Sequence, residues 1–242
     1  MTLNIFTAEL LGTMLLLLMG GGVVANVLLA RSKGLGGGTL MINFGWGLAV
    51  FSGVWVAAAS GAHLNPAVTV GIWVNGDISE FAPGVAKTLL AALAYFGAQM
   101  IGAMAGSTLC YLAYKQHFDT EKDPALKLAV FSTSPAIRSY GWNMLTEAIG
   151  TFVLVFVIAG FGQTPHGLGP LAVALLVTGI GASLGGPTGY AINPARDLGP
   201  RIVHALLPLK NKGGSDWSYA WVPVIGPLLG GLAGGLGAMA LF

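Results

Sequence analysis

The 242-residue chain has 8% charged residues against 55% hydrophobic ones, and its formal net charge is only +2. A soluble domain carries about 25% charged residues, so this composition excludes a water-soluble globular protein, and the absence of a basic excess excludes a nucleic-acid-binding one. The mean hydropathy of +0.76 is typical of a protein embedded in a lipid bilayer.

Six apolar runs are long enough to cross a membrane, which takes about 20 residues in a helix. The first run is too long for the core of a signal peptide and lacks a basic segment before it, so we expect a retained helix. The composition and these runs predict an all-α membrane protein with six transmembrane helices. The runs cover residues 5–30, 38–59, 84–113, 140–161, 168–185 and 219–242.

The chain divides into two similar halves around its longest and most charged polar segment. ELLGT at residues 9–13 matches EAIGT at residues 147–151. Each half contains three spanning runs, an odd number, so the second half must enter the membrane from the opposite side. We therefore expect one domain over residues 1–242, built from inverted repeats at about 1–114 and 140–242 that are joined by a loop at 115–139. Shorter polar loops are expected at 30–36, 161–169 and 209–218.

The tripeptide Asn-Pro-Ala occurs once in each half, before an apolar piece too short to span a membrane. These pieces are residues 66–75 and 194–206. Proline suits the first position of a helix and asparagine is a favoured N-cap, so each motif predicts a helix start. Inside a bilayer a helix can start only where its free backbone groups are buried in protein or line a water-filled cavity.

Two such starts from opposite faces would meet near the middle of the membrane. Both positive helix ends would then point at one place, which opposes cations and favours neutral solutes rich in hydrogen-bond acceptors. The side-chain amides of Asn65 and Asn193 are expected to remain free to donate into the cavity.

The segments SGAHLNPAVT (60–69) and GYAINPARDLGPR (189–201) resemble the two signatures of the aquaporin superfamily, the major intrinsic proteins. The resemblance covers the whole chain and implies six tilted helices and two re-entrant half-helices around one pore, with subunits packed as a homotetramer. It implies a narrow point at the two motifs, made by Asn65, Pro66, Ala67, Asn193, Pro194 and Ala195.

The segment NPARD, with Asp197, resembles the glycerol-conducting branch, the aquaglyceroporins, and this resemblance implies that Asp197 holds nearby loops apart. Apart from the resemblance, a carboxylate is favourable in the first turn of a helix. The resemblance implies a selectivity filter of Trp46, Gly181, Tyr190 and Arg196. Trp46 stands one residue closer to Asn65 than the family's aromatic residue does. Gly45 fits the ungapped spacing and would leave a wider site, whereas a deletion in the turn at 57–60 would favour Trp46.

The chemistry of these filter residues suits a polyol. Two aromatic faces can hold the CH side of a carbon chain, Arg196 offers several N–H donors to its hydroxyls, and Gly181 leaves room. Tyr190 replaces the phenylalanine common in this branch, and its hydroxyl either narrows the site or adds a polar contact. The alternative interpretations are that Trp46 only packs against other helices and that Tyr190 lies at the membrane interface. Arg196 is harder to explain in this way, because an arginine at membrane depth indicates function.

Two carboxylates inside the apolar runs, Glu9 and Glu147, need buried partners. The resemblance implies that they support the two re-entrant loops and turn backbone carbonyls towards the pore. His63 is expected to be a packing and hydrogen-bonding residue near the cytoplasmic mouth. The residues expected to turn their carbonyls towards the pore are Tyr190 and Gly61, Ala62, His63, Leu64, Gly189, Ala191 and Ile192.

The sequence therefore predicts a passive channel for glycerol and other small uncharged solutes that also passes water and excludes ions and protons. No enzyme, cofactor or metal site is expected, and the partners are the solutes, the lipid bilayer and other subunits. The alternatives are a water-selective channel and an ion-coupled transporter that uses Glu9 and Glu147. We expect a bacterial inner membrane with both termini cytoplasmic, which places ten of the eleven Lys and Arg residues outside, against the positive-inside rule.

Overall fold

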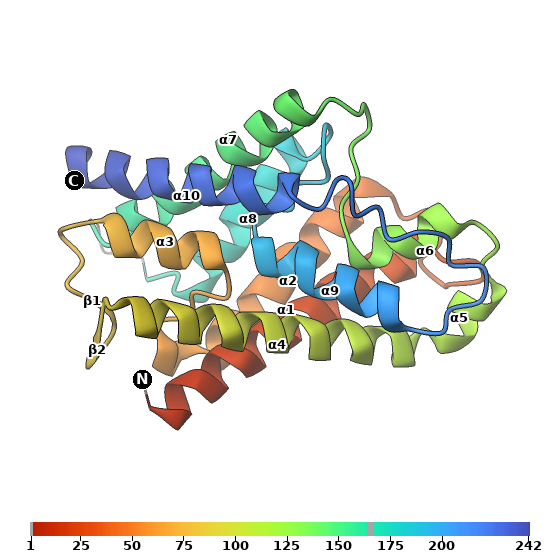
Figure 1. Ribbon diagram of the computed structural model, residues 1–242, viewed down its shortest axis with the longest axis horizontal. Coiled ribbons are helices and arrows are strands. Elements are labelled where there is room, and N and C mark those ends of the chain that lie inside the picture. The colour runs from red at the N-terminus through yellow and green to blue at the C-terminus, as the bar shows by residue number, and fades with distance from the viewer. Residues whose placement is uncertain (1, 164–166) are drawn as a thin grey trace.

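The computed structural model describes residues 2–163 and 167–242, so His166 and the middle of the expected 161–169 loop lie outside the described residues. The molecule is an elongated bundle of helices (Figure 1). The start of the first helix and the end of the last lie at the same end of its long axis. An even number of crossings brings the chain back in this way.

Within the described residues, five helices are long and apolar enough to cross a membrane. The helix in the sixth expected run, α8, is apolar but has only 15 residues because it begins at a proline that follows Gly169. The five long helices are α1 (Leu3–Leu28), α2 (Gly38–Val56), α4 (Leu89–Ala113), α7 (Tyr140–Gly160) and α10 (Val222–Leu241), and the shorter one is α8 (Pro170–Leu184).

The packing follows the repeat. The first and third helices of each half pair with each other, α1 with α4 and α7 with α10, and the second helices, α2 and α8, pack across the halves. Glycine permits the closest approaches, since a Cβ at Gly106 would lie 2.1 Å from the carbonyl oxygen of Met14 and one at Gly230 would lie 2.2 Å from that of Ala148. Small residues give membrane helices their main packing gain in this way.

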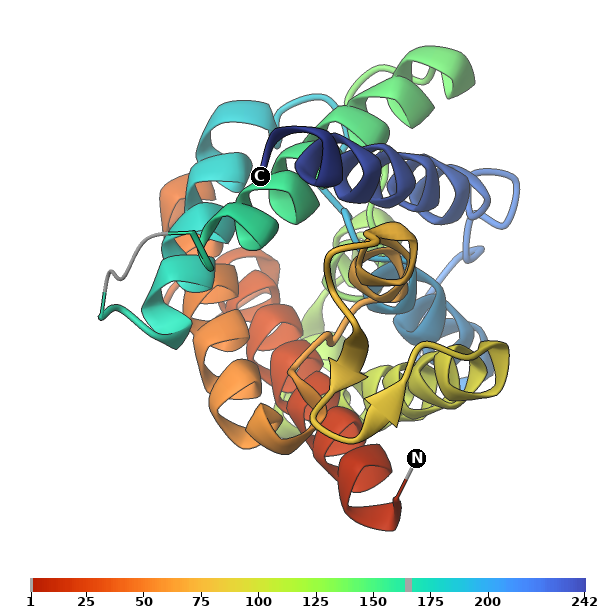
Figure 2. The same ribbon diagram turned by 90° about the vertical axis from the view of Figure 1, so that its left-hand side faces the viewer.

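The two expected half-helices are α3 (Pro66–Val74) and α9 (Pro194–Leu206). Each packs against the third long helix of the opposite half, α3 on α10 and α9 on α4. Figure 1 shows them nearly in line, with their N-terminal ends facing each other, and Figure 2 shows α3 inside the ring of long helices.

Some segments differ from the sequence-based expectation. The run 84–113 is not helical throughout, because β1 (Glu80–Ala82) pairs antiparallel with β2 (Val85–Ala86) and α4 starts only after the N-cap Thr88. The expected loop at 115–139 contains two short helices, and Asp123 caps the second of them ahead of Pro124. The remaining short helices are η1 (Ala58–Ser60), α5 (Lys115–Thr120) and α6 (Pro124–Phe131).

Candidate functional site

The two Asn-Pro-Ala motifs start α3 and α9 with the same geometry. The side-chain oxygen of Asn65 accepts a hydrogen bond of 2.8 Å from Ala67 N. That of Asn193 accepts from Ala195 N at 3.0 Å and from Arg196 N at 3.2 Å. Each cap satisfies backbone N–H groups that a helix start leaves without an intrahelical partner.

The side-chain amides of these asparagines bridge the two halves. Asn65 Nδ2 donates to the carbonyl oxygen of Ile192 at 2.7 Å, and Asn193 Nδ2 donates to that of Leu64 at 2.8 Å. The expectation that the amides stay wholly free is therefore wrong, because each commits one N–H to the opposite loop. Each amide has two hydrogens, so one remains for a solute.

The two loops before the motifs share an unusual backbone. Left-handed φ angles occur at matching positions in both: Gly61 (76°), Ala62 (52°) and Leu64 (54°), and Gly189 (81°), Tyr190 (39°) and Ile192 (43°). Non-glycine residues rarely adopt this conformation, and it persists only when the surroundings impose it. Carbonyls alternate in direction along an extended strand, and left-handed residues interrupt that alternation, so neighbouring carbonyls can face one side.

Glu9 imposes this conformation on the first loop. Its carboxylate accepts hydrogen bonds from the backbone N of Leu64, from Ser60 Oγ at 2.6 Å and from Gln99 Nε2 at 2.8 Å. Tyr95 adds a bond from its hydroxyl to the carbonyl of Ser60 at 2.7 Å. Three donors on a fully buried carboxylate offset the cost of removing it from water.

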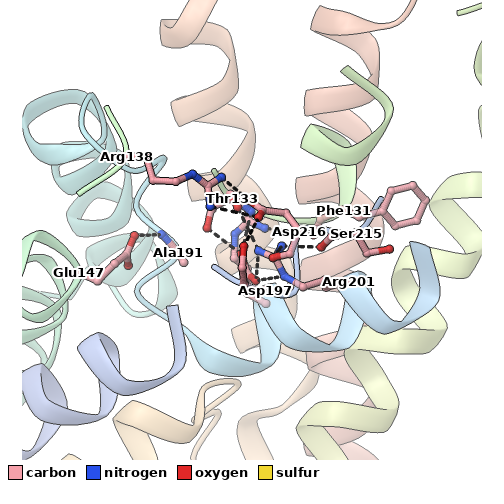
Figure 3. A network of polar contacts seen from close by, with 11 residues as sticks. Phe131, Thr133, Arg138, Glu147, Ala191, Asp197, Arg201, Ser215 and Asp216 are labelled. Carbon is pink, nitrogen blue, oxygen red and sulfur yellow. Dashed lines mark hydrogen bonds and ion pairs between the residues drawn. The ribbon is translucent and has the colours of Figure 1, made fainter. Parts of the chain in front are cut away.

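Glu147 does the same for the second loop. It accepts hydrogen bonds from Ala191 N at 3.0 Å and from Ile192 N at 2.8 Å, and Figure 3 shows the carboxylate pointing at this loop. Glu9 and Glu147 therefore occupy equivalent places in the two halves, each directed at a loop backbone.

Three cavities follow one another past these loops. The central cavity is bounded by both asparagines, by seven loop residues and by aliphatic side chains of the long helices. It shares Val68, Ile72 and Ile158 with an inner cavity beside α3, α7 and α10. The loop residues on the central cavity, besides Tyr190, are Gly61, Ala62, His63, Leu64, Ala191 and Ile192.

A third cavity, the outer cavity, adjoins the central cavity opposite the inner one, next to residues 129–136. It shares Trp46, Tyr190 and Arg196 with the central cavity, so these three residues stand where the two cavities adjoin. Gly189, expected with the pore carbonyls, borders the outer cavity instead.

The guanidinium of Arg196 lies over the ring of Trp46, 4.1 Å from its centre. A Cβ at Gly181 would lie 2.6 Å from Cζ of Tyr190, so only glycine leaves room for that ring. A Cβ at Gly45 would instead meet Val23 of α1 at 2.5 Å. Of the two candidate positions on α2, Trp46 borders the cavities and Gly45 faces a neighbouring helix.

The remaining residues of the motifs are structural. Pro66, Ala67, Pro194 and Ala195 are buried. The carbonyl oxygen of Ala67 packs closely on α10, since a Cβ at Gly231 would lie only 2.3 Å from it. His63 bonds through its ring nitrogens to Thr69 Oγ1 at 2.9 Å and to the carbonyl of Phe81 at 3.0 Å.

Asp197 ties loops together rather than holding them apart. One carboxylate oxygen accepts bonds of 2.7 Å from both N and Oγ1 of Thr133, and the other pairs with Arg201 at 2.7 Å (Figure 3). Arg201, fully buried, also donates to the carbonyls of Thr133 and Ser215 at 3.0 and 2.8 Å. We did not predict Arg201 from the sequence, although its position one turn after Asp197 was a usable signal.

Lysines cap the far ends of both half-helices. Lys87 Nζ donates to the carbonyl of Asn75 at 2.6 Å, at the end of α3. Lys212 Nζ donates to those of Ala205 and Leu207 at 2.6 and 2.7 Å, at the end of α9. A cation at a helix C-terminus complements the dipole, so each half-helix is held at both ends.

Half-helices that meet N-terminus to N-terminus beside a row of cavities, inside a ring of apolar helices, define a membrane channel of the aquaporin type. The chain belongs to the major intrinsic protein family, whose model matches residues 2–237. The "Probable glycerol uptake facilitator protein" of Thermotoga maritima is 52% identical over 96% of this chain and 97% of its own. The "Glycerol uptake facilitator protein" of Bacillus subtilis is 50% identical over 98% and 84%.

Among solved structures, the aquaglyceroporin from Plasmodium falciparum aligns with a TM-score of 0.84 and 32% identity, covering 98% of this chain and 96% of the other. Membership of this family makes the protein a passive channel rather than an enzyme.

Proposed function

We propose that the protein conducts glycerol and similar small uncharged solutes down their gradients, and water with them. The observation that carries this proposal is the junction of the central and outer cavities, where Trp46, Tyr190 and Arg196 adjoin beside the space that Gly181 leaves. The names of the relatives from Thermotoga maritima and Bacillus subtilis support the same solute.

In this proposal, a polyol sheds water at the filter because protein groups replace it on both sides. Its CH groups contact the faces of Trp46 and Tyr190, and its hydroxyls accept hydrogen bonds from Arg196. Further in, hydroxyls donate to the loop carbonyls and accept from the second N–H of Asn65 and Asn193. The aliphatic lining of the central cavity matches the carbon side of the solute along the whole path.

Ions and protons are excluded, on this proposal, by electrostatics along the path. The positive ends of α3 and α9 converge where Asn65 and Asn193 cross-bond, and Arg196 stands one step outside. A cation would lose its water and meet positive potential at both places.

An ion-coupled transporter would need an ionisable group on the solute path. Glu9 and Glu147, the candidates from the sequence, are instead turned to backbone and side-chain donors of the two loops. This geometry favours a passive channel. A water-selective channel is disfavoured by the relatives from Thermotoga maritima and Bacillus subtilis, which are named for glycerol uptake.

We further propose a homotetramer in the inner membrane of a bacterium, with both termini cytoplasmic. Exposed apolar side chains such as Leu40, Leu90 and Trp142 give the long helices surfaces suited to lipid or to other subunits. The start of α1 and the end of α10 lie at the same end of the long axis (Figure 1), which supports placing both termini on one side of the membrane.

The test is stopped-flow light scattering on proteoliposomes, with water, glycerol and a five-carbon polyol, with and without a pH gradient. Fast glycerol flux that ignores the gradient supports the proposal, and fast water flux without glycerol contradicts it. Arg196→Val should lose discrimination between glycerol and the larger polyol. Arg31→Gln, which removes the same charge from an exposed loop, is the matched control and should behave like the unmodified protein.

A further inference from the structure

Asn43 is a polar residue of α2 that is not one of the four proposed filter residues. It lies one helical turn before Trp46, on the same face, and borders the outer cavity together with Trp46, Tyr190 and Arg196. Its side chain is buried, with 6% of its surface exposed. Within the part of the chain that the structure describes, its carboxamide makes no hydrogen bond, whereas its backbone carbonyl accepts one of 3.5 Å from Thr178 Oγ1 across to α8.

The hydroxyl of Tyr190 is also buried and also lacks a hydrogen-bond partner among the described residues. It also lies next to Asn43, since a Cβ placed on Gly181 would be 2.8 Å from the Tyr190 hydroxyl and 2.7 Å from Asn43 Oδ1. Two unpaired polar groups thus converge on one point at the edge of the outer cavity.

Buried polar groups without partners are costly, and native proteins rarely keep them without a reason. A carboxamide offers two N–H donors and an acceptor, and a phenol hydroxyl offers one donor and an acceptor. A solute hydroxyl is itself both donor and acceptor, so it can satisfy both groups at once. The aromatic faces of the filter cannot do this, because they contact only CH groups.

We propose that Asn43 and the Tyr190 hydroxyl form an entry subsite that binds one hydroxyl of a polyol just before the solute passes between Trp46 and Arg196. This inference rests on the proposed function and names the residue that makes the channel prefer solutes with several hydroxyls. Asn43 contacts the solute directly, and Gly181 is required because a side chain there would displace both Asn43 and Tyr190.

The subsite should separate solutes with the same carbon chain but different numbers of hydroxyls. Glycerol can keep one hydroxyl on Asn43 and Tyr190 while another reaches Arg196. A propanediol has one hydroxyl fewer, so it gains less from the subsite. The ratio of glycerol flux to 1,2-propanediol flux through the same protein is therefore the direct readout.

The experiment measures this ratio by stopped-flow light scattering on proteoliposomes for four single variants and one double variant. Asn43→Leu removes the polar group at similar size, Asn43→Ser keeps a hydroxyl, and Tyr190→Phe removes only the phenol oxygen. Thr178→Val is the matched packing control, because Thr178 also lies between α2 and α8 but its hydroxyl donates to backbone carbonyls, of Ala174 at 2.9 Å and of Asn43 at 3.5 Å. Detergent gel filtration confirms that each variant is folded.

Asn43→Leu should lower the glycerol-to-propanediol ratio by roughly 3- to 10-fold, the range for one lost hydrogen bond, with water flux at least maintained. Asn43→Ser should recover part of the ratio. Asn43→Leu combined with Tyr190→Phe should lose less than the product of the two single effects, because both groups serve one hydroxyl.

An unchanged ratio in Asn43→Leu, or an equal loss in Thr178→Val, would overturn the inference and assign Asn43 to helix packing or to bound water. A different result, no glycerol flux through the unmodified protein, would instead overturn the proposed function. The two failures are therefore distinguishable.

Discussion

The guanidinium of Arg196 is stacked on the ring of Trp46 at 4.1 Å, and among the described residues its one hydrogen bond is a long one of 3.5 Å to the carbonyl of Phe131, at the end of α6. A cation over an aromatic face is stabilised by about 0.5–2 kcal/mol, more when water is excluded. The position of this arginine, and hence the width between the two cavities, thus depends on Trp46.

Replacing Trp46 should therefore widen the filter and free Arg196 together. We expect Trp46→Leu to raise the flux of a five-carbon polyol severalfold while glycerol flux changes less, because the aromatic face that orients the solute is lost. Phe51→Leu, also an aromatic-to-aliphatic change on α2 but away from the cavity-lining residues, is the control. Equal effects of the two changes on proteoliposome flux would contradict a filter role for Trp46.

Enlarging Gly181 should close the same point. A Cβ there would lie 2.6 Å from Cζ of Tyr190 and 2.7 Å from Oδ1 of Asn43, so Gly181→Ala must displace both side chains. We expect glycerol flux to fall by about tenfold or more, as steric closure of a pocket by one methyl costs 1–3 kcal/mol. Gly179→Ala, on the same helix with open space around it, should leave flux unchanged.

Glu147→Gln tests whether the carboxylate holds the second loop. The amide can accept only through its oxygen, and its NH2 group would oppose the N–H of Ala191 or Ile192. Leaving a buried donor unpaired costs about 1–3 kcal/mol, so we expect a lower Tm and reduced flux of both water and glycerol. Thr146→Val, an adjacent hydroxyl bonded only to its own helix, provides the comparison. Normal flux at an unchanged Tm would show that the loop holds its shape without the carboxylate.

The ion pair of Arg138 and Asp216 should make the two loops that it joins, 115–139 and 209–218, sensitive to acid. Burial alone would raise the pKa of the Asp216 carboxyl, but hydrogen bonds from Arg138 and Ser218 hold it below its ordinary value. A depressed pKa adds stability above the unfolded value of about 3.9 and loses it as the pH falls through the folded value. The protection of residues 209–218 against hydrogen exchange, relative to the intrinsic rate at each pH, should decrease below about pH 4.

Asp216→Asn should abolish that acid dependence and give faster exchange of the same residues at neutral pH, since the ion pair of 2.6 Å is already lost. Lys33→Gln is a control for the loss of an exposed charge on another loop. A pH profile shared by all three proteins would mean that other groups govern the loop.

Local sequence rules predicted the start of each half-helix well, because Asn-Pro caps act within a few residues. They also predicted the far ends to within one residue, at Val74 and Leu206. They did not predict the capping lysines, because Lys87 and Lys212 reach the last carbonyls from separate loops. The choice between Gly45 and Trp46 also depended on tertiary structure. The turn of η1 (Ala58–Ser60) determines how much chain separates α2 from Asn65.

Other differences have similar physical causes. The hairpin of β1 and β2 has too few residues to produce an alternating pattern, so the apolar residues of β2 were assigned to the following helix. The amides of Asn65 and Asn193 were expected to be free because their acceptors lie in the opposite half. No pattern within one half can predict a contact that depends on how the two halves dock.

Those crossed amide bonds have a consequence for how the channel is made. A ribosome delivers Asn65 long before Ile192, so the first half enters the bilayer with its amide still lacking the carbonyl it finally uses. The loop of Asn193 then completes both bonds as it seats against Leu64. A chain that ends before Ile192 therefore lacks the carbonyl that Asn65 uses, and the point where α3 and α9 meet is completed only when the second half is in place.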